Sequence, residues 1–149
     1  FSNDFGNCYT YALGLDCPDV FYKKFEEFEK GYRDFSIGFI SNPMVTGDLC
    51  RCSDFSHKLM FNLIKDLEDL QIEYFDSDFG IKNIHGGSKI AIFYNNGFIC
   101  RDFHVIRENI DGSWSEKCGY GGNVQIIDEP QNNPYHLLKV LELKKPKIK

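Results

Sequence analysis

Hydrophobic residues recur at two different intervals along the chain, and each interval predicts a different kind of element. After Asp16 and Pro18, which favour the start of a helix, aromatic residues follow one another at helical spacing through an otherwise charged segment. These residues are Phe21, Phe25, Phe28 and Tyr32. The spacing predicts an amphipathic helix whose aromatic stripe packs into the core.

A second helical pattern follows a segment that contains two glycines and a proline. This segment, residues 36–48, is predicted to be a loop, after which Ser53 can cap a helix. The apolar positions of that helix are Phe55, Leu59, Leu63, Leu67 and Leu70. His57 lies on the same helix, and we interpret it as a partly exposed histidine.

The second half of the chain contains short apolar runs separated by turn signals. Residues 95–97 (Asn-Asn-Gly) and residues 109–112 (Asn-Ile-Asp-Gly) have the chemistry of hairpin turns. The predicted strands cover residues 89–94, a segment from Phe98 through His104, a segment with Trp114 and Glu116, residues 123–127 and, as a strand or a short helix, residues 135–143.

Helices that precede a run of strands indicate an α+β fold and not the alternating order of a parallel sheet. We therefore expect N-terminal helices packed on a consecutive antiparallel meander. The length of 149 residues fits one domain, so residues 1–149 are expected to form a single unit. Cysteine hydrolases use this order, with a cysteine on an early helix and a histidine on a later strand.

Composition narrows the class of protein. Hydrophobic residues make up 42% of the chain and charged residues 26%, which is typical of a folded domain. The net charge of −5 argues against a nucleic-acid partner, because the basic residues are dispersed. The exception is a terminal run of lysines, which we interpret as a solvated chain end. Its members are Lys144, Lys145, Lys147 and Lys149.

No apolar stretch approaches the roughly 20 residues that a membrane span needs, so we expect a soluble protein, or a soluble fragment, without a membrane span. The chain begins at Phe1 and not at Met, which indicates a processed protein, a trimmed chain or an excised domain. The sequence does not identify the compartment in which the protein acts, and it is compatible with secretion or with delivery into a target cell.

Six cysteines form an even number, but a chain of this size needs no disulfide framework, so we expect mostly free thiols. Cys50 and Cys52, with His57 nearby, leave open a zinc-stabilised adaptor. A structural zinc usually needs a second well-spaced pair of ligands, which the sequence does not show. We therefore expect neither a metal nor a cofactor.

The segment from Gly6 to Gly14 is predicted to form a short helix, with Asn7 as its cap and Cys8 in its first turn. Backbone N–H groups and the positive end of the helix dipole favour a thiolate there and lower the pKa of a cysteine. The same N–H groups can donate to an oxyanion. The alternative is that Cys8 is buried and packs as a small hydrophobic residue.

His104 is the candidate general base. It lies between Phe103 and Val105 on a predicted strand, so its side chain faces the opposite side of the sheet from both neighbours. If the helix that carries Cys8 packs across that face, the imidazole can accept the thiol proton and later return it to a leaving group. The alternative is a histidine exposed on a strand.

Glu116 is predicted to orient His104. It lies twelve residues further along the chain, across the turn at residues 109–112, where a carboxylate can hold the second ring nitrogen. Asp102, Asn123 and Asp128 remain competitors for this role. Asp102 is expected on the opposite face from its close neighbour His104.

Three segments carry a family resemblance: residues 7–13 (Asn-Cys-Tyr-Thr-Tyr-Ala-Leu), residues 102–104 (Asp-Phe-His) and residues 111–117 (Asp-Gly-Ser-Trp-Ser-Glu-Lys). Together they resemble the NlpC/P60-like branch of papain-like cysteine enzymes, and most closely its bacterial toxin and effector domains. The resemblance implies a papain-like fold, a cysteine on a helix, a histidine on a strand and a polar third residue about a dozen positions later. In that family the third residue is often a histidine, whereas this chain has Glu116.

A triad of Cys8, His104 and Glu116 predicts a cysteine peptidase or amidase that cleaves an amide bond through a thioester at Cys8. Glutamine deamidation and acyl transfer use the same intermediate and stay open as alternatives. A further alternative is a catalytically inactive domain that binds a protein partner, which predicts an inert Cys8.

A peptide or protein is the expected substrate, and a monomer is the expected state. Tyr9, Trp114 and Tyr120 are candidates to line the substrate cleft, although Trp114 also fits a packing role within the sheet. Residues 36–48 are a candidate wall or lid of the same cleft.

Overall fold

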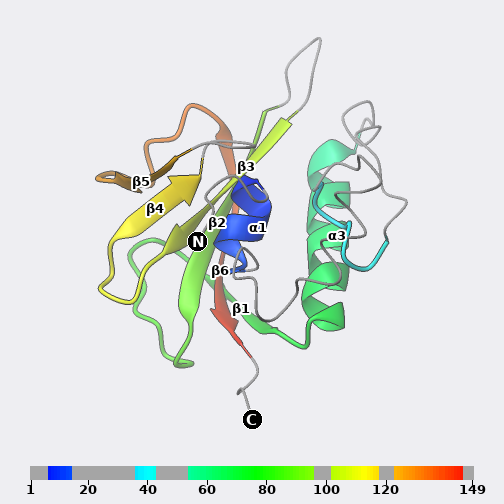
Figure 1. The fold of residues 1–149 in the computed structure, drawn as a ribbon, viewed down its shortest axis with the longest axis horizontal. Coiled ribbons are helices and arrows are strands. Elements are labelled where there is room, and N and C mark those ends of the chain that lie inside the picture. Colours follow the sequence, from blue (N-terminus) through cyan, green and yellow to red (C-terminus); the bar gives the residue numbers. More distant parts are fainter. Residues whose placement is uncertain (1–6, 15–35, 43–53, 96–101, 118–122, 146–149) are drawn as a thin grey trace.

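A six-stranded antiparallel sheet forms the centre of the molecule (Figure 1). The computed structural model describes residues 7–14, 36–42, 54–95, 102–117 and 123–145. Its helices are α1 (Cys8–Ala12) and α3 (Phe55–Asp69). Its strands are β1 (Glu73–Ser77), β2 (Ser88–Asn95), β3 (Asp102–Glu108), β4 (Trp114–Lys117), β5 (Val124–Ile127) and β6 (His136–Lys144).

Strands that neighbour one another along the chain are not always neighbours in the sheet. The spatial order is β1-β6-β2-β3-β4-β5, so β6 lies between β1 and β2. Ala91 of β2 is paired with Val140 of β6 on one side and with Ile106 of β3 on the other. Both faces of β6 are buried along residues 140–143, which explains its place inside the sheet.

The predicted papain-like α+β fold, with N-terminal helices packed on a consecutive antiparallel meander, is wrong for the described part of the chain. That part is mostly sheet, with two helices of 5 and 15 residues that are not arranged on the sheet in the predicted way. The meander extends only from β2 to β5, because β6 returns to pair with β2. The helix predicted over residues 21–32 lies outside the described residues.

Several local predictions are confirmed. The apolar pattern from Phe55 corresponds to α3, and the turn at residues 109–112 is closed by a hydrogen bond of 2.9 Å from the Gly112 N–H to the Asn109 carbonyl. Gly112 has a positive φ of 87°, which glycine adopts without strain. Residues 135–143, which were predicted to form a strand or a short helix, correspond to the strand β6. Ser53 and the turn at residues 96–97 lie outside the described residues.

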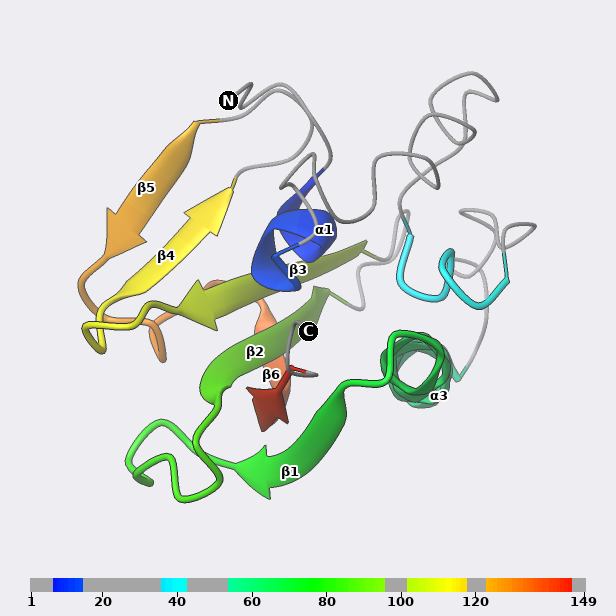
Figure 2. The same cartoon turned by 60° about the horizontal axis from the view of Figure 1, so that its bottom comes forward.

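Apolar side chains form one core on each face of the sheet. On the face covered by the helices, Tyr9 of α1, Leu13 directly after α1 and Leu63 of α3 pack with Ile92 and Val105 of the sheet. Figure 2 shows α1 over β3, with α3 on the same side of the sheet. The opposite face has a smaller core, which consists of Ala91, Phe93, Ile106, Trp114 and Val140.

Within the described residues, neither helix is long and apolar enough to cross a membrane.

Candidate functional site

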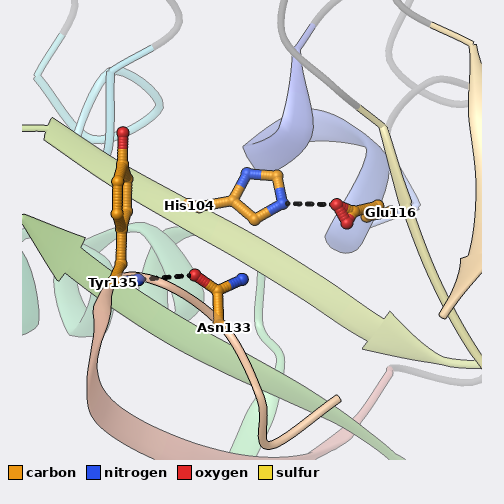
Figure 3. A network of polar contacts seen from close by, with 4 residues as sticks. All are labelled: His104, Glu116, Asn133 and Tyr135. Carbon is orange, nitrogen blue, oxygen red and sulfur yellow. Dashed lines mark hydrogen bonds and ion pairs between the residues drawn. The ribbon is translucent and has the colours of Figure 1, made fainter. Parts of the chain in front are cut away.

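His104 and Glu116 point toward one another across the gap between β3 and β4 (Figure 3). The distance between His104 Nε2 and Glu116 Oε1 is 3.3 Å, and the two side chains are 17% and 15% exposed. The ladder between the strands pairs Arg107 with Ser115 and Glu108 with Trp114. By extension of this register, Glu116 lies one diagonal step from His104, where long side chains reach each other.

The contact has the distance of an ion pair but not the geometry of a hydrogen bond. His104 Nε2 is buried and makes no hydrogen bond within the described part of the chain. A small rotation of either side chain would align Nε2–H with the carboxylate, as often happens when a catalytic site closes on its substrate. Such a bond would fix the proton on Nε2 and leave Nδ1 as the basic nitrogen.

Cys8 is the first residue of α1, as predicted. The Asn7 side chain caps this helix by accepting hydrogen bonds from the backbone N–H groups of Tyr9, at 3.1 Å, and Thr10, at 3.2 Å. The Thr10 hydroxyl in turn accepts from the Asn7 N–H at 2.9 Å. This reciprocal capping box stabilises a helix of only five residues and fixes the backbone at Cys8.

The predicted lowering of the Cys8 pKa is wrong. The pKa of the thiol is raised to about 12, mainly by burial and also by the nearby charge of Asp102, and the backbone N–H of Val105 only partly opposes this rise. Cys8 is only 6% exposed, so the loss of hydration outweighs the backbone donors. At neutral pH the resting side chain is therefore a thiol and not a thiolate.

The backbone N–H of Val105 is close enough to the thiol to oppose the rise in its pKa, and Val105 directly follows the candidate base His104. The helix itself lies on the face of β3 that carries Phe103, whose ring contacts Tyr9 at a centroid distance of 6.4 Å. Strand alternation turns His104 to the other face. The predicted packing of α1 across the face that carries His104 is therefore wrong, because α1 lies on the opposite face of β3. None of the contacts in the described part of the chain joins Cys8 to His104.

Tyr135 and Asn133 lie on the same face of β3 as His104. Sequence analysis did not identify either as a site residue. Tyr135 donates its hydroxyl to Asp102 Oδ2 at 3.1 Å. Its backbone N–H donates to the Asn133 side chain at 2.9 Å (Figure 3). Asp102 was expected on the opposite face from His104, but residues two apart on a strand share a face. No local pattern marks Tyr135, because its contact with Asp102 spans 33 residues.

Asp66 connects α1 to the rest of the helical face. Its buried carboxylate accepts hydrogen bonds from the Tyr9 hydroxyl at 2.6 Å and from the backbone N–H groups of Gly38 and Ser41, each at 2.8 Å. Burial raises the pKa of Asp66, and these hydrogen bonds oppose that shift. The network positions the residue that follows Cys8, and sequence analysis did not predict it.

Several residues that were predicted to line or cover a substrate cleft are buried in the core instead. Tyr9 is fully buried and Trp114 belongs to the core, so neither lines an open cleft. Ile37 and Phe39 are also buried, which contradicts a lid formed by the described part of residues 36–48. His57 is exposed on α3, as expected. Tyr120 lies outside the described residues.

Asn123 and Asp128, the other competitors of Glu116, flank β5, and none of the described contacts joins either of them to His104. Cys50 and Cys52 lie outside the described residues. Within those residues, no cluster of three or more histidine, cysteine or acidic side chains could hold a metal ion.

Comparison with known proteins gave no match to a family model, a curated protein or a solved structure.

Proposed function

We propose that this chain is a thiol hydrolase that cleaves an amide bond in a peptide or protein, with Cys8 as nucleophile and His104 as general base. The observation that supports this proposal most strongly is the 3.3 Å approach of Glu116 Oε1 to His104 Nε2. A carboxylate in contact with one ring nitrogen makes the other nitrogen the better base. The backbone N–H of Val105, the residue after His104, is close enough to Cys8 to oppose the rise in the pKa of its thiol.

The reaction begins with a protonated thiol, because burial raises the pKa of Cys8 to about 12. As the sulfur attacks the substrate carbonyl carbon, Nδ1 of His104 takes the thiol proton, and Glu116 stabilises the imidazolium that forms. The C–N bond then breaks, the imidazolium gives its proton to the departing amine, and a thioester remains on Cys8. Water, deprotonated by His104, attacks the thioester and regenerates the thiol.

This sequence of steps requires that a carbonyl carbon reach a sulfur that is 6% exposed in the resting structure. Cys8 must therefore gain exposure when substrate binds. Because α1 and His104 lie on opposite faces of β3, the first turn of α1 must also shift relative to β3 to bring the sulfur within reach of Nδ1. Glutamine deamidation and acyl transfer follow the same proton path, and differ only in the amine that leaves and in the nucleophile that resolves the thioester.

The burial of Cys8 also favours a second candidate function. A cysteine whose pKa is raised to about 12 is a poor nucleophile unless a base assists it, so an inert Cys8 in a protein-binding domain also fits this environment. The two candidates differ in whether His104 makes Cys8 reactive toward an acyl donor.

Incubation with p-nitrophenyl acetate, followed by peptide mapping by mass spectrometry, tests the hydrolase proposal. We expect an acetyl thioester on Cys8 in the native chain, and its loss in Cys8→Ser and His104→Ala. His57→Ala is a matched control, because it removes an exposed histidine from α3 and should leave the acetylation of Cys8 unchanged. Equal acetylation of Cys8 in the native chain and His104→Ala would favour the binding domain.

A further inference from the structure

A cavity of about 900 Å³ is lined by residues at the start of β2 and at the ends of β3 and β6. Ser88 and Leu143, which are paired across β2 and β6, line it, and Ala12 at the end of α1 forms part of its wall. Cys8 lies at the other end of α1 and is not part of the lining. Pockets of this size can hold small organic ligands.

The lining is rich in cations although the chain as a whole is acidic. It contains Arg107, Lys144 and Lys145, together with Lys89, whose Nζ donates to the Ile81 carbonyl, but only two carboxylates, Glu108 and Asp111. The chain carries a formal net charge of −5, so this local excess of positive charge is opposite to the overall charge. A concave site lined mainly by one sign of charge attracts ligands of the other sign.

Both carboxylates of the lining are already held by donors of the chain. Glu108 Oε1 accepts from the Asn83 side chain at 2.6 Å and from the Lys89 backbone N–H at 3.3 Å. Asp111 Oδ1 accepts from the backbone N–H of Ser113 at 2.9 Å and from its hydroxyl at 2.6 Å, and these bonds lower the pKa of Asp111. These acidic groups are therefore oriented by the protein itself.

Arg107 is fixed at the edge of the cavity. Its Nη1 donates to the Tyr11 carbonyl at 3.0 Å, and its Cζ lies 3.8 Å from the centroid of the Tyr11 ring. A guanidinium has five N–H donors, so this anchoring leaves donors that can face an anion in a fixed orientation. Lys145 folds back against Gly14, just beyond α1, and lies in the same lining.

The uncharged part of the lining is mainly apolar, with Ser88 and Asn109 as its polar side chains. Ala12, Ile90 and Leu143 contribute buried surface, whereas Ile110 in the turn after β3 is 105% exposed. A ligand with an apolar part would remove the Ile110 side chain from water, which is favourable by the hydrophobic effect. The lining therefore offers cationic donors beside apolar surface.

We propose that this cavity binds a small organic anion, in which a phosphate or carboxylate group is attached to an apolar part. In this account Arg107, Lys144 and Lys145 contact the anionic group, and Ile90, Ile110 and Leu143 contact the apolar part. The two lysines belong to the terminal basic run that the sequence alone indicated to be a solvated end. The proposal is independent of the reaction proposed for Cys8.

Titration of the ¹⁵N-labelled chain with phenyl phosphate, followed by amide chemical shifts, tests this site. We expect saturable shifts at Gly87, Asn109 and Ile110, which weaken at high salt because screening acts on the charge attraction. Phenol, which lacks the anionic group, should not cause these shifts at the same concentration. Benzoate in a parallel titration compares a carboxylate with a phosphate, and saturable binding of either at these amides supports the site.

The double variant Lys144→Gln, Lys145→Gln should weaken phenyl phosphate binding by about tenfold or more, which corresponds to ~1.4 kcal/mol. Both lysines are exposed, so the variant should keep the native spectrum. Lys65→Gln removes the same charge from an exposed position on α3 and should bind as the native chain does. The proposal is overturned if the cavity amides do not shift, or if the double variant and Lys65→Gln bind equally well.

Discussion

Cys8 occupies the first position of α1, where backbone donors favour a negative charge, yet the environment of its sulfur has the opposite effect. The helix has only five residues, and the thiol is packed against β3. Desolvation disfavours the charged form and raises the pKa to about 12, against an ordinary value of 9.0. In the proposed reaction His104 therefore has to act as a base, because no preformed thiolate is available.

The raised pKa predicts a specific dependence of stability on pH. The folded chain holds the Cys8 proton more tightly than the unfolded chain, so this contribution to the free energy of unfolding is complete below pH 9.0 and is lost as the pH rises toward 12. Urea unfolding at a series of pH values should show a steeper loss in the native chain than in Cys8→Ala. Parallel curves for the two chains would contradict the burial of a protonated thiol.

Two contacts at the scale of elements hold the site in place. Asp66 joins α3 to α1 through Tyr9, and it also orders the turn at residues 36–42. On the sheet, Gly87 precedes β2 at the point where β2 meets β6, and a side chain there would collide with the Leu143 carbonyl. The first contact positions the helix of Cys8, and the second permits β6 to lie inside the sheet.

Asp66→Ala should lower the free energy of unfolding by about 3 kcal/mol, because it leaves the Tyr9 hydroxyl and the Gly38 N–H buried without an acceptor and also removes the acceptor of the partly buried Ser41 N–H. Asp69→Ala is the control, since Asp69 is exposed on the same helix and its loss should cost less than ~1 kcal/mol. Denaturation in urea measures both. Similar losses for the two variants would show that Asp66 does not connect α1 and α3.

Gly87→Ala should destabilise the fold by about 1–3 kcal/mol, because the added methyl group would push β2 away from β6. Gly80→Ala is a matched control, since a Cβ at Gly80 meets no atom within 4 Å. Thermal unfolding of the two variants compares them directly. An equal melting temperature for both would argue against the close approach of residue 87 to β6.

For the whole molecule, local features could be predicted from the sequence, whereas distant pairings could not. The turn at residues 109–112 places His104 and Glu116 on adjoining strands only twelve residues apart, so turn chemistry and strand periodicity were sufficient to predict their contact. The position of β6 depends on the burial of both its faces and on its pairing with strands that are distant in the sequence. Chain order alone predicts a meander and therefore does not predict this pairing.

The burial of Cys8 could not be predicted for the same reason. It results from packing against β3, nearly a hundred residues away along the chain, and the helix-start pattern contains no information about that contact. The link between Tyr135 and Asp102 and the link between Tyr9 and Asp66 are likewise long-range contacts without a local signal.

The central claim is that Cys8, His104 and Glu116 act as one unit, and a double-mutant cycle tests it most directly. The measurement is the rate at which p-nitrophenyl acetate acylates Cys8 in the native chain, His104→Ala, Glu116→Gln and the double variant. We expect His104→Ala to slow the reaction by roughly 10²–10⁴-fold. Glu116→Gln should have a smaller effect, which disappears when His104 is already absent, because Glu116 acts only through the imidazole.

A rate in the double variant equal to that in His104→Ala is the result that this account predicts. Two results would contradict it: a Glu116→Gln effect of the same size with and without His104, or an acylation rate of Cys8 that neither substitution changes.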